Sequence, residues 1–146
     1  MFYFAYGSNM DPEQMEERTP GARALGAARL GGYRLTFTRD SPAWGGGVGH
    51  IEADANDEVW GVLWDLTEDH LGSLDVYEGI DVGAYVRETL TVSFDGRDVE
   101  AHVYLAIPRG YKQPSKKYMS ALIRGAEAHG CPDDYIERLR SQASGV

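Results

Sequence analysis

The sequence has a single cysteine, no long apolar run and no cluster of basic residues, and each shortage excludes a class of protein. Cys131 has no partner for an internal disulfide, which favours a reducing compartment. No segment approaches the roughly 20 apolar residues that a membrane-spanning helix needs. Lysines and arginines number 14 against 23 acidic residues, a net charge of −9. Neither a nucleic acid nor an anionic membrane is therefore an expected partner, because both select clustered positive charge.

The N-terminus, the histidines and the glycine run argue against a signal peptide, a metal site and a dinucleotide site. The apolar start at Phe2 lacks the basic segment of a signal peptide, so a cytoplasmic location is expected. The four histidines share no ligand spacing with one another or with Cys131, and no metal site is expected. The glycines at 45–49 lack the strand–turn–helix context of a dinucleotide site.

The 146 residues suit one domain, residues 1–146, and their pattern is mainly that of strands joined by tight turns. Strands are predicted at residues 2–6, 29–38, 48–54, 58–66, 84–94 and 99–107. Helices are predicted at residues 12–18, 67–77, 115–129 and 133–140. Hairpin turns are expected at residues 55–57 and at Asp95-Gly96. This order of elements predicts an α+β fold built on a small antiparallel or mixed β-barrel.

The first predicted strand stops abruptly at Gly7-Ser8-Asn9, and a helix start follows with Asp11 as the cap and Pro12 at the first helical position. Glycine allows backbone conformations closed to other residues. Amide N–H groups left free in such a turn can hold a carboxylate, a phosphate or a developing oxyanion. A sharp turn without a ligand fits the same residues. Ser8 lacks the G-x-S-x-G pattern of a hydrolase nucleophile.

Glu78 is the second candidate, because it falls at the end of the helix predicted at 67–77. The negative end of a helix dipole disfavours an ionised carboxylate, and partial burial near Tyr77 and Tyr85 would raise the pKa of Glu78 further. Such a group can exchange protons near neutral pH. An ordinary solvated glutamate before a helix cap is the alternative.

Several motifs together resemble the γ-glutamylcyclotransferase family. They are Tyr-Phe-Ala-Tyr-Gly-Ser-Asn at 3–9, Trp-Gly-Gly at 44–46, Val-Trp-Gly-Val-Leu-Trp at 59–64, Leu-Asp-x-x-Glu-Gly at 74–79 with Tyr85, Val-Tyr-Leu at 103–105, Pro-Ser-x-x-Tyr at 114–118, and the Gly-Ala, Gly-x-Pro and Tyr positions of 125–135. Their order and spacing fit the family over nearly the whole chain.

This resemblance implies a small β-barrel flanked by helices, with no cofactor. It also implies that the chain cleaves a small γ-glutamyl amide by internal cyclisation, releasing 5-oxoproline and an amino acid or amine. Glu78 would be the catalytic acid/base. The implied substrate-binding residues are Tyr3, Phe4, Ala5, Tyr6, Gly7, Ser8, Asn9, Tyr85 and Tyr118.

Two other functions fit the same motifs. One is a cyclotransferase for γ-glutamylamines, whose leaving group has no carboxylate, and the other is a non-catalytic module that binds a small acidic compound. The residues 41–47 fit either a lid over the site or a surface loop anchored by Trp44. No sequence feature indicates an oligomeric state.

Overall fold

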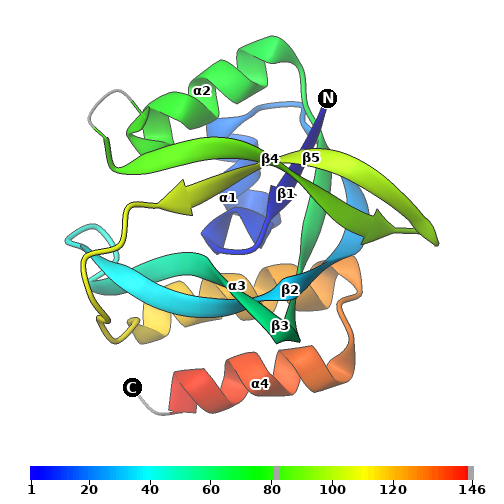
Figure 1. The fold of residues 1–146 in the computed structure, drawn as a ribbon. Coiled ribbons are helices and arrows are strands. Elements are labelled where there is room, and N and C mark those ends of the chain that lie inside the picture. Colours follow the sequence, from blue (N-terminus) through cyan, green and yellow to red (C-terminus); the bar gives the residue numbers. More distant parts are fainter. Residues whose placement is uncertain (81–82, 145–146) are drawn as a thin grey trace.

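Five strands close into a barrel in the order β1-β3-β2-β4-β5 (Figure 1), in a computed structural model that describes residues 1–80 and 83–144. The strands are β1 (Phe2–Ala5), β2 (Arg23–Ser41), β3 (Gly46–Asp65), β4 (Tyr85–Phe94) and β5 (Arg97–Ala106). All neighbours run antiparallel except β1 and β5, which close the barrel in parallel with Tyr3 opposite His102. The predicted mixed barrel is confirmed.

The hairpin predicted at residues 55–57 is wrong, because β3 continues through it as one long strand paired with β2. Residues 54–57 lie opposite Gly32 alone, whose φ of 82° bends the partner strand. The carboxylates of Asp54 and Asp57 accept hydrogen bonds from backbone amides within this stretch and just after it. The polar residues that suggested a turn therefore satisfy the backbone of a bulge.

The loop predicted at residues 41–47 is shorter than expected, because β2 extends to Ser41 and β3 begins at Gly46. Glycine is required at Gly47 by close packing. A Cβ there would lie 2.0 Å from the carbonyl oxygen of Lys112, and the Gly47 amide donates to the Gln113 carbonyl at 2.9 Å. The glycine run thus lets the chain after β5 pass directly over the β2–β3 hairpin.

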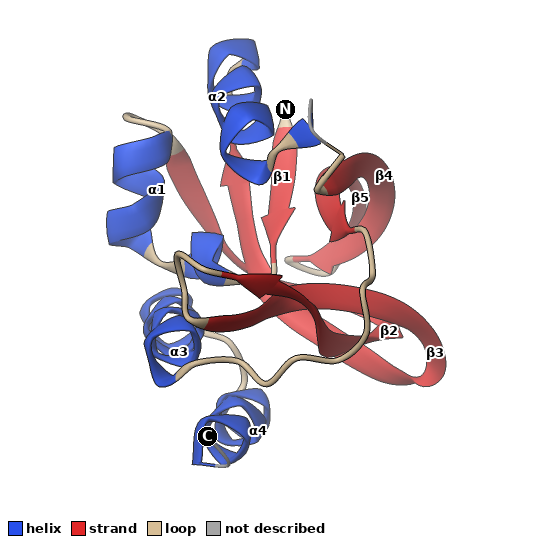
Figure 2. Ribbon diagram, turned by 90° about the vertical axis from the view of Figure 1, so that its left-hand side faces the viewer, coloured by secondary structure: helices blue, strands red, loops and turns tan. Residues whose placement is uncertain are grey.

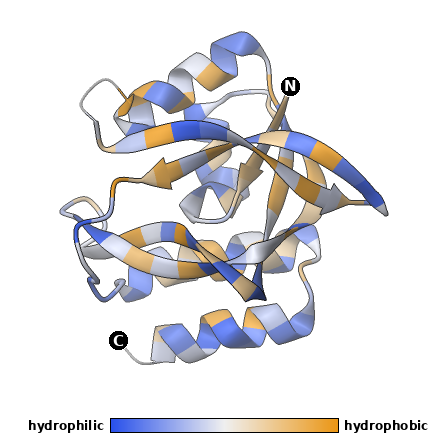
Figure 3. Ribbon diagram, viewed as in Figure 1, coloured by the Kyte–Doolittle hydropathy of each residue, from blue (hydrophilic) through white to orange (hydrophobic). Residues whose placement is uncertain are grey.

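The turn between β4 and β5 confirms the hairpin predicted at Asp95-Gly96. Both residues have positive φ, 51° and 75°, as a two-residue turn matched to the strand twist requires. The tip of this hairpin is hydrophilic (Figure 3).

The helices and the 3₁₀ turn whose bounds lie within the described residues surround the barrel. They are η1 (Ser8–Met10), α1 (Pro12–Arg18), α2 (Glu68–Glu78), α3 (Lys116–His129) and α4 (Asp133–Ser144). The side chains of Asp11, Thr67 and Ser115 cap α1, α2 and α3. Figure 2 shows α1 and α2 on one side of the sheet layers and the α3–α4 pair on another.

Packing of α3 against η1 fixes the N-terminal turn on the barrel. A Cβ at Gly125 would lie 2.3 Å from the backbone carbon of Met10, so only glycine allows this approach. Met10, Met119 and Leu122 are fully buried at the same contact. Within residues 1–80 and 83–144, none of the helices has the length and apolar character needed to cross a membrane.

Candidate active site

The turn after β1 is stabilised by its own backbone and by close packing. The Met10 amide donates to the Gly7 carbonyl and the Asp11 amide to the Ser8 carbonyl, each at 3.0 Å, so these two amides are not free to hold an anion. The Gly7 backbone does not occupy the left-handed region, because its φ is −111°. Glycine is required there by space, since a Cβ would lie 2.7 Å from the Tyr118 hydroxyl oxygen.

Asn9 connects this turn to the surrounding side chains. Its side chain is buried, and its amide nitrogen donates to the Tyr3 hydroxyl at 2.9 Å and to Glu78 Oε1 at 3.2 Å. Its oxygen accepts from Gln14 Nε2 at 2.9 Å and Arg18 Nη1 at 3.1 Å. These four contacts fix the orientation of the Asn9 amide.

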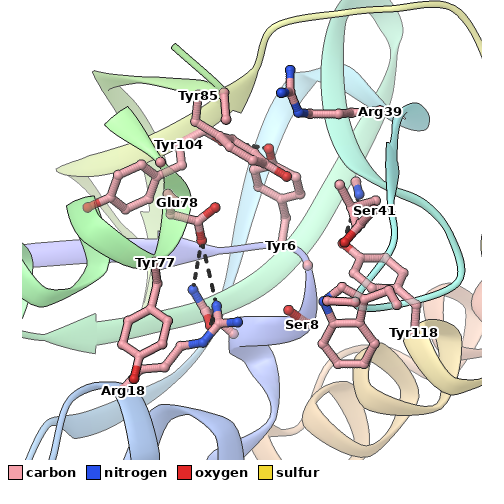
Figure 4. Close-up of a pocket in the computed structure, with 18 of the residues that line it drawn as sticks. Tyr6, Ser8, Arg18, Arg39, Ser41, Tyr77, Glu78, Tyr85, Tyr104 and Tyr118 are labelled. Atoms are coloured by element: carbon pink, nitrogen blue, oxygen red, sulfur yellow. Dashed lines mark hydrogen bonds and ion pairs between the residues drawn. The ribbon is translucent and has the colours of Figure 1, made fainter. Parts of the chain in front are cut away.

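Glu78 is the last residue of α2, before Gly79 turns the chain in the left-handed conformation. Its side chain is 15% exposed and points into a cavity (Figure 4), with Arg18 Nη1 4.0 Å from Oε1. Burial raises the pKa of Glu78 to about 7, although the Arg18 charge and the Asn9 hydrogen bond lower it. The carboxylate can therefore gain and lose a proton near neutral pH.

Tyr118 lies across the cavity from Glu78 and is also buried. Its hydroxyl oxygen accepts a hydrogen bond from the Gly49 amide at 2.8 Å, and burial raises its pKa, so the hydroxyl keeps its proton. Among the described residues no acceptor is found for that proton. The Trp44 ring packs edge-on against the Tyr118 ring, with centroids 5.3 Å apart.

The cavity between these elements has a volume of about 360 Å³. Eight of the residues predicted for the site line it: Tyr3, Tyr6, Gly7, Ser8, Asn9, Glu78, Tyr85 and Tyr118. A cavity of this size suits a small molecule.

Known proteins resemble this chain in sequence and in fold. The model of the AIG2-like family matches residues 58–139. The γ-glutamylcyclotransferases of Homo sapiens and Bos taurus are 35% and 36% identical to this chain, each over 95% of this chain and 77% of the relative. A solved structure of a γ-glutamyl cyclotransferase has a TM-score of 0.93 and 34% identity, over 97% of this chain and 86% of that one.

The chain belongs to the γ-glutamylcyclotransferase family. It is an enzyme that acts on a small-molecule substrate, and the resemblance inferred from its motifs is confirmed.

Two residues of the family motif, Phe4 and Ala5, do not line the cavity. Both are buried in the core, and the Phe4 ring packs over Gly61 of β3. Successive side chains of a strand point to opposite faces, so Phe4 points away from the face that carries Tyr3. Both side chains therefore have a packing role, and a substrate contact of this part of the strand stays a prediction.

Several residues that the sequence did not indicate also line the cavity: Arg18, Arg39, Val48, Gly49 and Tyr104. Arg18 ends α1 and lies over the Tyr77 ring, 4.8 Å from its centroid. Arg39 lies near the end of β2. Neither arginine has a local pattern that distinguishes it from a surface cation. Trp44 and the hairpin end at residues 41–44 also line the cavity.

Residues that could hold a metal are not grouped in residues 1–80 and 83–144, where no cluster of three or more His, Cys, Asp or Glu side chains occurs. Cys131 is buried, and burial raises the pKa of its thiol to about 11. A thiol of this kind is a packing residue and a weak nucleophile.

Proposed function

We propose that this enzyme cleaves γ-glutamyl amides by attack of the substrate's own α-amino group on its γ-carbonyl, releasing 5-oxoproline and an amino acid or amine. The observation that supports this most directly is the Glu78 carboxylate, which points into the cavity with a pKa of about 7. Proton transfer is most efficient when the pKa of the group lies near the working pH.

In the proposed reaction Glu78 performs both proton transfers. The ionised carboxylate accepts a proton from the substrate's α-amino nitrogen as that nitrogen bonds to the γ-carbonyl carbon. The bond from this carbon to the leaving nitrogen then breaks, and protonated Glu78 returns the proton to that nitrogen. Nucleophile and carbonyl belong to one molecule, so the cavity only has to fold the glutamyl chain into a reactive conformation.

The turn at residues 6–8 and Tyr118 are proposed to bind the glutamyl part. The Tyr118 hydroxyl accepts from Gly49, which leaves its proton free to donate to a substrate oxygen. Tyr6 and Tyr85 supply aromatic walls of this cavity.

A product screen tests this function. Purified enzyme is incubated with γ-glutamyl amino acids, γ-glutamylamines and glutathione, and 5-oxoproline is measured by mass spectrometry. We expect equimolar 5-oxoproline and amine from at least one substrate. Glu78→Gln should lower kcat by roughly 10²–10⁴-fold while substrate binding is retained. Glu68→Gln, an exposed position at the start of the same helix, is the matched control.

Each alternative has its own result in this screen. Near-normal turnover by Glu78→Gln would exclude the proton-transfer role of Glu78. Measurable binding of γ-glutamyl compounds without any 5-oxoproline would identify a binding module that has lost catalysis. Turnover of the amines alone would identify a γ-glutamylamine cyclotransferase.

A further inference from the structure

Arg39 is a half-buried cation with an unsatisfied hydrogen-bond donor. It lines the cavity near the end of β2, and its Nη1 atom is buried without a hydrogen-bond partner. Among the described residues no carboxylate lies within ion-pair distance of its guanidinium. A buried charged donor without a partner lowers the stability of the fold. Its presence at the cavity therefore indicates that a bound ligand supplies the acceptor.

The other cation that lines the cavity, Arg18, is already engaged. It donates to Asn9, lies 4.0 Å from Glu78 and covers the Tyr77 ring. Arg39 is therefore the lining cation that is available to an anionic group of the substrate.

The surroundings of Arg39 strengthen its positive potential. A second cavity of about 370 Å³ shares Arg39, Asp40 and Pro42 with the first, and Arg109 and Lys112 also line it. Asp40 is the one acidic residue among the described residues that line this second cavity. Three cations against one carboxylate form a locally basic region in a chain whose net charge is −9. Such a region attracts anions to this end of the site.

The position of Arg39 indicates which part of the substrate it meets. Figure 4 shows Arg39 and Ser8 on opposite sides of the cavity, with Tyr6 and Tyr85 between them. Arg39 is close enough to Tyr85 to lower the pKa of its hydroxyl, against a larger rise caused by burial. If the glutamyl part is held at the turn that contains Ser8, the leaving group extends toward Arg39.

We propose that Arg39 binds the carboxylate of the leaving amino acid and so determines the preference of this enzyme for γ-glutamyl amino acids over γ-glutamylamines. The proposal rests on the proposed function. A guanidinium presents parallel N–H donors that match the two oxygens of a carboxylate, which gives geometric selectivity as well as attraction. An amine leaving group offers no such acceptor and leaves the buried Nη1 unsatisfied.

Two substrates that differ only in this carboxylate test the proposal, γ-glutamyl-L-alanine and γ-glutamylethylamine. We expect Arg39→Met to lower kcat/KM for γ-glutamyl-L-alanine by roughly 10- to 100-fold. The kcat/KM for γ-glutamylethylamine should change by less than about threefold. Arg39→Lys should keep part of the preference, because it keeps the charge. Arg34→Met is the matched control, because Arg34 is exposed on β2 and does not line the cavity. It should leave kcat/KM for both substrates unchanged.

Three results would overturn the role of Arg39. The first is an equal loss of kcat/KM for both substrates in Arg39→Met, which would place the guanidinium on the glutamyl part. The second is no loss of kcat/KM for either substrate. The third is the same loss of substrate preference in Arg39→Lys as in Arg39→Met. Circular dichroism verifies that each variant is folded.

Failure of the proposed function is distinguished by a binding measurement. Calorimetry with the same two amides in the Glu78→Gln background reports the preference without turnover. In this background, γ-glutamyl-L-alanine should bind more tightly than γ-glutamylethylamine, and the difference should disappear when Arg39→Met is added. If the wild type releases 5-oxoproline from no compound of the product screen, but this preference is present and is lost with Arg39→Met, the proposed reaction is wrong and the carboxylate site is supported. If no preference is present, the carboxylate site is wrong.

Discussion

The side-chain amide of Asn9 donates a hydrogen bond to Glu78 Oε1 at 3.2 Å, across 69 positions of the sequence. The same nitrogen donates to the Tyr3 hydroxyl, and the Asn9 oxygen accepts from Arg18. This contact joins the turn after β1 to the end of α2. It also favours the ionised form of a carboxylate whose burial favours the neutral form.

Asn9→Ala should therefore raise the pKa of Glu78 above its present value of about 7. The rising limb of kcat/KM against pH should move upward by roughly one pH unit, and Asn9→Asp should move it further because it adds a like charge. Asn56→Ala, at the bulge of β3, should leave the profile in place. An unmoved profile in Asn9→Ala would show that this hydrogen bond does not tune the carboxylate.

The raised pKa of Glu78 also affects stability. The folded protein binds this proton more tightly than the unfolded chain, so the contribution to stability is complete below the ordinary value of 4.5 and is lost as the pH rises through about 7. Glu78→Gln removes this titration. Its free energy of unfolding relative to wild type should increase by roughly 2 to 3 kcal/mol between about pH 5 and about pH 8.

Urea unfolding followed by circular dichroism at the two pH values measures this difference. Glu68→Gln, which is exposed, should show no comparable dependence on pH. A constant difference between Glu78→Gln and wild type would mean that Glu78 has the same pKa in the folded and unfolded chain.

Local chemistry made the helix ends predictable from sequence. Asp11, Thr67 and Ser115 cap helices within three residues of their own position, and Gly79 and Gly130 end helices by adopting positive φ. Such signals need no knowledge of the rest of the chain. The bulge at residues 54–57 was missed because its turn-like residues are overridden by pairing along β2, which is a long-range interaction.

In the candidate site, too, local signals indicated some residues, and long-range packing brought in others. Glu78 was found because it ends a helix and belongs to a motif, whereas Arg18 and Arg39 reach the cavity only because the barrel brings α1, α2 and the end of β2 together. The sequence suggested that Gly7 provides backbone freedom in the turn after β1. Its φ is negative, and the close contact that disfavours a side chain there comes from Tyr118 on a helix far along the chain.

Tyr118→Phe should weaken substrate binding more than it slows the chemical step. The variant removes a hydroxyl that faces the cavity and also leaves the buried Gly49 amide without its acceptor. We expect KM to rise several-fold with kcat retained, and stability to fall by about 1–3 kcal/mol. Steady-state kinetics and urea unfolding measure both effects, with the exposed Tyr111→Phe as the control. An unchanged KM with a collapsed kcat would instead assign Tyr118 to the chemical step.

Gly7→Ala should disrupt the site through Tyr118. The new Cβ would lie 2.7 Å from the Tyr118 hydroxyl oxygen but 3.8 Å from the ring carbon that carries it, which is an ordinary contact. The clash is therefore with one oxygen atom, and relieving it by movement of the turn or of α3 should cost about 1–3 kcal/mol of stability and raise KM.

A double-mutant cycle isolates this clash. Because Tyr118→Phe removes the oxygen, adding Gly7→Ala in that background should cost clearly less stability than adding it to wild type, with a coupling of roughly 1 kcal/mol or more. Gly72→Ala, on an open face of α2 with no atom within 4 Å of the added carbon, should be neutral or stabilising. Additive losses in the cycle would mean that Gly7 is required for a reason other than the Tyr118 hydroxyl, and that the turn and α3 are independent parts of the site.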